Sequence, residues 1–338
     1  MVTAENNKIT FRFPEVHKDA TFTIEFQRTL RIPDDNREYP LPPSLGNFPL
    51  FHVEDYAHKL PEQWKSWGGV FLPMYQAEAL WLNFSGDYPF AVKVAAGKIN
   101  AVTGKEWQNE INPSPQDYLV IPDQLWLDGF CVRKGYVRQF VAMPLGQGYT
   151  AEEQITGNAD FGGIQLVVYP MKADRWEKIL EQRRERRLDQ TCFSLSPSVY
   201  YCASEPSSPA MGLAPGGLMK QKIYDDEYGY DAWDTSVSSR CFTHLVNTEQ
   251  FTKITGATSP SRPLNADDYT KAGLPWFELY DEGKESVSGS KDLAGLHSVG
   301  AMQGQKGENV LGHNDPVVDP KIKSIKHQAS TAVKDGPW

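Results

Sequence analysis

The stretch that decides the fold reads Trp126-Leu-Asp-Gly-Phe-Cys-Val132, then Arg133-Lys134-Gly135, then Tyr136-Val-Arg-Gln-Phe-Val141. Two segments rich in β-branched and aromatic residues flank three residues that end in glycine, which is the pattern of a β-hairpin. We expect this hairpin to span Leu125 to Met143. Antiparallel pairing is therefore the first feature that the sequence predicts.

Similar strand patterns extend from this hairpin toward the N-terminus. Apolar residues alternate with polar ones from Ile9 to Phe13 and again from Thr21 to Ile32, as in half-buried strands. Short extended segments bounded by Gly, Pro, Asn or Asp follow at 90–94, 99–102, 118–121 and 164–169. The sequence thus predicts a mostly β protein with an antiparallel sandwich or barrel-like core.

A few helices interrupt this pattern. Thr150-Ala-Glu-Glu153 forms a capping box for a short helix that ends near Gly157. Cap residues predict two further short helices, from Asn247 to Gly256 and from Asn265 to Gly273. One longer helix is expected near 174–188, with a basic cluster at its end that suits a helix C-terminus.

Composition divides the chain into three parts. We expect a β-rich core domain over 1–172, and a helix with an irregular β and loop region over 173–282 that packs on this core. Aromatic residues almost vanish from 283–338, so little apolar area remains there to offset chain entropy. A weakly structured tail is the expectation for this last part.

Charge and apolar content exclude several classes of partner. The 338-residue chain has a formal net charge of −9, whereas nucleic-acid surfaces need clustered cations, so we expect no nucleic-acid partner. No apolar run approaches the roughly 20 residues of a membrane-spanning helix. The first residues lack the basic and apolar regions of a secretory signal, and the four cysteines form no dense framework, so we expect a cytoplasmic location. A bridge between Cys192 and Cys202 stays open as an alternative.

The most distinctive segment is Ile223-Tyr-Asp225-Asp226-Glu227-Tyr228-Gly-Tyr230-Asp231-Ala-Trp233-Asp234, here called the acidic aromatic strip. Its carboxylates could bind Ca²⁺ and its rings could stack on a sugar. An EF-hand is excluded because Tyr230 stands where that loop needs glycine. The alternative is a solvated loop that its aromatic residues anchor.

Other motifs carry weaker signals. Gly212 to Gly217 with Lys220 lacks the spacing of a phosphate loop, and a turn that enters a strand over 219–224 is the favoured interpretation. Two trios could ligate a metal, namely His52, Asp55 and His58, and His313, Asp315 and Asp319, but neither has strong geometry. Cys241 and His244 would point to opposite faces of a strand, which disfavours a catalytic pair.

Three segments resemble a family of uncharacterised microbial proteins. They are Val141-Ala-Met-Pro-Leu-Gly-Gln-Gly-Tyr-Thr150 with Glu153-Gln154, Gly163-Ile-Gln-Leu166, and Met211-Gly-Leu-Ala-Pro-Gly-Gly-Leu-Met-Lys-Gln221. The likeness covers roughly residues 20–300. It implies a shared fold, and it implies no activity, cofactor or catalytic residue.

Two functional hypotheses follow. The first is a soluble, non-catalytic binding or scaffold protein that holds a protein or glycan through exposed aromatic residues. The alternative is a carboxylate- or metal-dependent hydrolase that acts at the acidic aromatic strip, with one protonated and one ionised carboxyl group. The sequence assigns neither a cofactor nor a metal. The candidate ligand-binding residues are Asp225, Asp226, Tyr228, Tyr230, Asp231, Trp233, Asp234 and Trp126.

Overall fold

The computed structural model describes residues 1–35, 37–186, 210–279, 283–309, 314, 317 and 320–324, without the side chains of residues 183–186. Cys192, Cys202, His313, Asp315 and Asp319 lie outside the described residues. In the described part of the chain, no helix is long and apolar enough to cross a membrane.

Strands dominate the fold, so the predicted mostly β class is confirmed. Seventeen strands of the described chain join one sheet, in which most pairs are antiparallel. They are β1 (Val2–Glu5), β2 (Lys8–Arg12), β3 (Thr21–Thr29), β4 (Glu38–Tyr39), β5 (Ser44–Asn47), β6 (Phe51–His52), β7 (Val70–Met74), β8 (Ala79–Ser85), β9 (Phe90–Ala96), β10 (Ile99–Asn100), β11 (Leu119–Ile121), β12 (Trp126–Leu127), β13 (Gly129–Arg133), β14 (Tyr136–Pro144), β15 (Ile164–Pro170), β16 (Ala210–Lys220) and β17 (Ser239–Asn247). β18 (Trp276–Glu278) and β19 (Ile322–Ser324) form a separate parallel pair.

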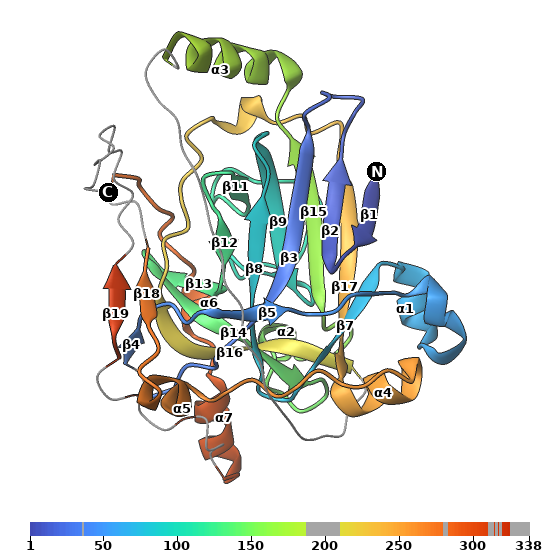
Figure 1. Cartoon of the computed structure of the whole chain (residues 1–338), viewed down its shortest axis with the longest axis vertical. Helices are drawn as coiled ribbons and strands as arrows, with labels where there is room; N and C mark the ends of the chain where they lie inside the picture. Colours follow the sequence, from blue (N-terminus) through green and yellow to red (C-terminus); the bar gives the residue numbers. More distant parts are fainter. Residues whose placement is uncertain are drawn as a thin grey trace, which may run out of the picture.

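The large sheet has two arms that enclose the core. One arm runs β2-β3-β8-β14-β16, and the other runs β9-β15-β17-β7. β16 and β17 pair at one end and so connect the arms. Phe22 of β3 packs on Phe90 of β9 with ring centroids 5.4 Å apart, although these two strands share no hydrogen bonds. The arms therefore face each other across the core (Figure 1).

The predicted hairpin is present as β13 and β14, in which Arg133 pairs with Tyr136 across Lys134 and Gly135. Its first strand is shorter than expected, because β12 pairs with β8 instead. The break falls at the buried Asp128. Glycine follows it for a steric reason, since a Cβ at Gly129 would lie 1.9 Å from the carbonyl oxygen of Arg138.

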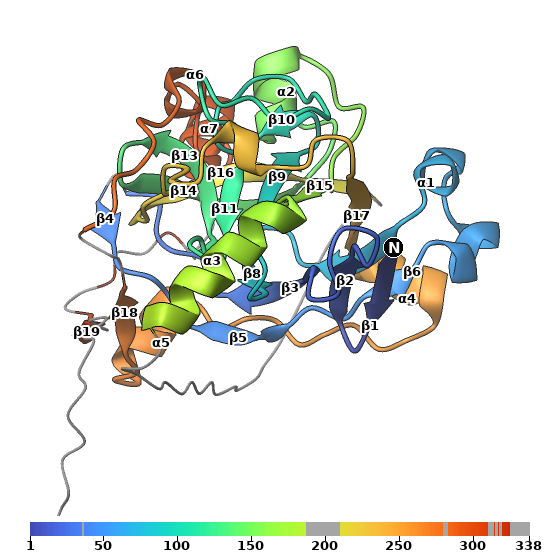
Figure 2. The same ribbon diagram turned by 90° about the horizontal axis from the view of Figure 1, so that it is seen from above.

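Short helices cover the ends and edges of the sheet. They are η1 (Glu54–Lys59), α1 (Glu62–Trp67), α2 (Ala151–Thr156), α3 (Ala173–Arg186), η2 (Tyr230–Ala232), α4 (Thr248–Thr255), α5 (Ala266–Lys271), α6 (Lys291–Ala294) and α7 (Val299–Lys306). The predicted capping box at Thr150 and the predicted caps at Asn247 and Asn265 are present. In Figure 2, α3 lies across the molecule, and its buried Trp176 packs on Tyr88.

Two strands within residues 173–282 are longer than expected. β16 and β17 belong to the main sheet, whereas the sequence predicted an irregular β and loop region here. The glycines of β16 do not form a turn or a phosphate loop. They let neighbouring elements approach, because a Cβ at Gly217 would lie 2.4 Å from the carbonyl oxygen of Pro33.

The expected weakly structured tail is also corrected for residues 283–309. This segment contains α6 and α7, and Leu293 and Val299 are fully buried. Ser290 fixes α6 to the body by donating its hydroxyl proton to the carbonyl oxygen of Thr103 at 2.6 Å. A few apolar side chains are enough to dock this segment on the core. The average composition of residues 283–338 does not reveal them.

Candidate functional site

The acidic aromatic strip is anchored to the core, and the ring of its Trp233 is buried. Trp233 is only 1% exposed, so its ring does not lie at the surface, where the binding hypothesis needs it. Its indole N–H donates to Asp226 Oδ2 at 2.8 Å, and the Tyr118 hydroxyl donates to the same oxygen at 2.6 Å. The backbone N–H of Tyr228 donates to Asp226 Oδ1. Asp226 therefore holds the loop on the core, which is why Trp233 is drawn inside.

The other carboxylates of the strip do not share one binding partner. Asp225 and Asp231 are exposed, while Asp234 accepts hydrogen bonds from the backbone and hydroxyl of Ser236. Tyr228 is half-buried and Tyr230 is 40% exposed. No hydrogen bond joins two of these acids in the described chain, and the hydrolase hypothesis stays a prediction.

Trp126 is held by contacts within the fold. It is half-buried in β12, and its carbonyl oxygen accepts from the side-chain amides of Gln124 and Gln221. Burial raises the pKa of the neighbouring Asp128 to about 7, and a hydrogen bond from the Trp126 side chain opposes this rise. Trp126 therefore belongs to a polar cluster that also reaches the start of the strip, because Gln124 Oε1 accepts from the backbone N–H of Tyr224 at 3.1 Å.

No group of three or more metal-ligating side chains is assembled among the described residues. His52, Asp55 and His58 are exposed on β6 and η1. His52 Nε2 donates instead to the carbonyl oxygen of Ala4 at 3.0 Å.

A concave site of the described chain lies elsewhere, between β1 and β17. It is a groove of about 750 Å³, open to solvent. Figure 1 shows β1 and β2 beside β17, with α1 close to the same end. The lining includes Val2, Thr3 and Ala4 of β1, residues 238–242, and the aromatic residues Trp67, Trp107, Phe161 and Phe242.

An unpaired strand edge lines each side of this groove. β15 pairs with β17 along Ser239 to Thr243, whereas β7 begins to pair on the opposite side only at Thr243. A Cβ at Gly69 would lie 2.1 Å from the Phe242 carbonyl oxygen, so this oxygen points away from β15. Backbone groups of alternate residues point the same way, so those of Arg240 also face the groove.

β1 presents the second edge. The backbone N–H of Arg12 in β2 donates to the carbonyl oxygen of Met1 at 2.8 Å. By alternation, the backbone groups of Val2 and Ala4 point away from β2, and on this side the Ala4 carbonyl oxygen accepts from His52 Nε2. No described strand pairs with this outer edge of β1. The groove therefore has backbone donors and acceptors on both sides.

Partly exposed rings form one wall. Trp67 at the end of α1 stacks on Phe161 with centroids 4.7 Å apart, and Phe242 packs on Trp67 at 4.9 Å. The ammonium of Lys98 lies 4.1 Å from the Phe161 ring centroid. These rings offer apolar area with little loss of conformational freedom on binding.

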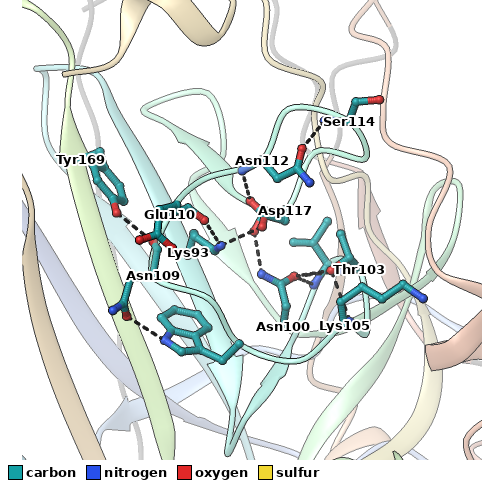
Figure 3. A network of polar contacts seen from close by, with 12 residues as sticks. Lys93, Asn100, Thr103, Lys105, Asn109, Glu110, Asn112, Ser114, Asp117 and Tyr169 are labelled. Atoms are coloured by element: carbon teal, nitrogen blue, oxygen red, sulfur yellow. Dashed lines mark hydrogen bonds and ion pairs between the residues drawn. The ribbon is translucent and has the colours of Figure 1, made fainter. Parts of the chain in front are cut away.

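A buried polar network supports the wall near Trp107 (Figure 3). The ammonium of Lys93 lies 2.7 Å from Asp117 Oδ2 and also donates to the carbonyl oxygen of Glu110. The Trp107 indole N–H donates to Asn109 Oδ1, while Tyr169 donates to the Asn109 carbonyl oxygen. The network thus fixes the loop that carries Trp107.

Cys241 and His244 do not form a reactive pair. Burial raises the pKa of the Cys241 thiol to about 12 and lowers the pKa of His244 to about 4, so both are neutral near pH 7. His244 stacks on Trp64 with centroids 4.3 Å apart, and its Nε2 donates to the carbonyl oxygen of Gly68 at 3.1 Å. His244 is therefore a structural residue below the aromatic wall.

His244 makes stability depend on pH. Its unfolded pKa is near 6.5 and its folded pKa is about 4, so only the unfolded chain binds this proton between these values. We expect the free energy of unfolding to fall by on the order of 3 kcal/mol as pH falls from 7 to 4. Guanidinium denaturation across this range would measure it. The variant His244→Phe keeps the stacking and should lack this component, so parallel curves for both proteins would contradict the assignment.

Sequence reasoning missed the groove because its residues come from five distant segments. The signal available was local: Trp67 ends a short helix, and Arg240 and Phe242 lie two positions apart in the sequence. Nothing in the linear order places these residues beside β1.

Comparison of the chain with protein-family models, curated proteins and solved structures finds no match.

Proposed function

We propose that this protein is a non-catalytic binding protein, and that the groove between β1 and β17 receives an extended peptide segment of a partner protein. The observation that carries the proposal is the pair of unpaired strand edges on opposite sides of one groove. Exposed edges recruit extended chains because their N–H and C=O groups lack partners. An added strand would gain hydrogen bonds from the edge that it pairs with.

The wall residues supply the second part of recognition. In strand addition, backbone bonds give affinity and side-chain pockets give specificity. Trp67, Phe161 and Phe242 would contact apolar side chains of the segment, and Arg240 and Glu54 offer one charge of each sign. This proposal keeps the use of aromatic residues for binding but places it away from the acidic aromatic strip.

Proline at position 240 tests the backbone role. Ligands would first be selected from a displayed library of random peptides of about ten residues. Arg240→Pro removes an N–H that faces the groove, while proline is tolerated on an unpaired edge. We expect it to weaken peptide binding by roughly tenfold or more, since a lost hydrogen bond leaves a partner unsatisfied. Fluorescence anisotropy with a labelled peptide would measure the Kd.

Arg240→Ala is the matched control, because it removes the side chain and keeps the N–H. A smaller loss in this variant than in Arg240→Pro is expected. Equal affinities for wild type and Arg240→Pro would contradict strand addition. If a glycan array instead gave ligands that depend on Trp67 and not on the Arg240 backbone, the ligand would be a glycan.

A further inference from the structure

Arg31 is a buried cation whose guanidinium has no hydrogen-bond acceptor among the described residues. It follows the end of β3 and is only 4% exposed. Its three guanidinium nitrogens, Nε, Nη1 and Nη2, are buried, and none has a hydrogen-bond partner in the described chain. Buried polar groups are almost always hydrogen-bonded, and a buried guanidinium presents five donors. An unsatisfied one therefore indicates an absent acceptor.

The neighbouring Arg28 shows how the same region satisfies a guanidinium. Arg28 Nε donates to Glu78 Oε1 at 2.8 Å, and Nη2 lies 2.7 Å from the same oxygen. Arg28 also donates to the carbonyl oxygen of Ser261. The second oxygen of Glu78 accepts from the backbone N–H of Tyr75. Glu78 thus binds Arg28 and the Tyr75 backbone, and it accepts no hydrogen bond from Arg31.

Asp34, the carboxylate that acts on Arg31 electrostatically, contacts other donors. Asp34 Oδ1 lies 3.6 Å from the guanidinium of Arg138, and Asp34 Oδ2 accepts from the backbone N–H of Gly300 at 2.8 Å. Burial lowers the pKa of Arg31 to about 10, with Asp34 opposing this, so Arg31 stays charged near pH 7. Asp34 thus favours the charge of Arg31, but no described residue accepts a hydrogen bond from its guanidinium.

Arg31 lines a small cavity at the protein surface. The cavity leaves the centre of a water-sized atom about 20 Å³ of space, and a second cation, Arg262, lies in its lining. Arg262 is partly exposed, with its guanidinium carbon 5.7 Å from the Tyr75 ring centroid. Glu78 is the one carboxylate of the lining, so the cavity has an excess of positive charge.

We propose that Arg31 and Arg262 form a binding site for one oxyanion group, either inorganic phosphate or the carboxylate of a small organic acid. The planar guanidinium fork matches both carboxylate and phosphate oxygens. The cavity admits a single such group and no bulkier ligand. Its lining shares no residue with the groove between β1 and β17, so the site is independent of the proposed peptide binding.

Isothermal titration calorimetry tests this site on the full chain, first in a buffer without phosphate or carboxylate. Inorganic phosphate and acetate are the two probes, and we expect one of them to bind at a single site. Arg31→Met should abolish this binding. Arg262→Ala should weaken it at least tenfold, as loss of a charge-assisted hydrogen bond would.

Arg175→Ala is the matched control, since Arg175 is exposed on α3 and outside the cavity lining. It should bind the probe as wild type does. If Arg31→Met fails to fold, Arg262→Ala decides the question, because this side chain is partly exposed. Binding of phosphate alone would identify a phosphate site, and binding of acetate alone a carboxylate site. Absence of binding to wild type, or equal binding to wild type and Arg262→Ala, would overturn the proposal.

Discussion

Replacing Lys93 by methionine is expected to lower the free energy of unfolding by about 3 to 5 kcal/mol, because it leaves a largely buried carboxylate without its counter-charge. The Lys93 side chain is 1% exposed and that of Asp117 is 15% exposed, with 2.7 Å between the charged atoms. Burial raises the pKa of Asp117, and Lys93 opposes this rise. Without Lys93 the folded state must hold that charge alone or bind a proton.

Chemical denaturation of Lys93→Met and wild type would measure the difference. Since protonation removes the unpaired charge, the difference should shrink as pH falls toward the raised pKa of Asp117. The double variant Lys93→Met/Asp117→Asn should recover part of the loss.

Lys105→Met is the matched control for an exposed pair. Lys105 lies 2.6 Å from Asp292, but the side chains are 70% and 47% exposed. Such pairs contribute about 0 to 1 kcal/mol. Equal effects of the two lysine substitutions would refute the importance of burial at Lys93.

The second large effect is expected at Trp233. Trp233→Ala should destabilise the protein by about 3 to 5 kcal/mol, because it leaves a cavity among packed rings. Trp233 packs edge-on against Tyr118 and Tyr228, with centroids 6.3 and 5.9 Å apart. The variant also removes one donor to Asp226. Thermal and chemical denaturation would both detect the loss.

Tyr230→Ala provides the comparison within the same loop. Tyr230 is 40% exposed, and substitutions at exposed positions usually change stability by less than about 0.5 kcal/mol. A Trp233→Ala protein with wild-type stability and lost ligand binding would restore the original interpretation of this ring as a surface contact.

Local signals in the sequence predicted the local structure well. The hairpin around Lys134-Gly135, the capping box at Thr150 and the caps at Asn247 and Asn265 are all present. Each depends on residues within a few positions of one another, because turns and caps are stabilised by short-range hydrogen bonds and by allowed backbone angles. The alternation from Thr21 onward likewise predicted β3.

Predictions that required knowledge of distant neighbours failed. Glycines at 212, 216 and 217 suggested a turn, yet they lie in β16 because Thr150, Val141 and Pro33 approach there. Trp233 of the acidic aromatic strip was expected to be exposed, but it is buried, because it shares Asp226 with Tyr118, which lies more than a hundred positions earlier. A charge pattern alone does not show which partners the folded chain brings to it.

The sequence by itself determined the mostly β class, the main hairpin, and the helix caps, since alternation of apolar residues and turn chemistry act over short distances. Only the tertiary structure decided where the sites lie. It brought the edge of β1 to the edge of β17, and it buried Arg31 beside Arg262 without an acceptor. The physical reason is that long-range packing selects which strand edges stay unpaired and which charges stay unmatched, and such choices depend on the whole fold.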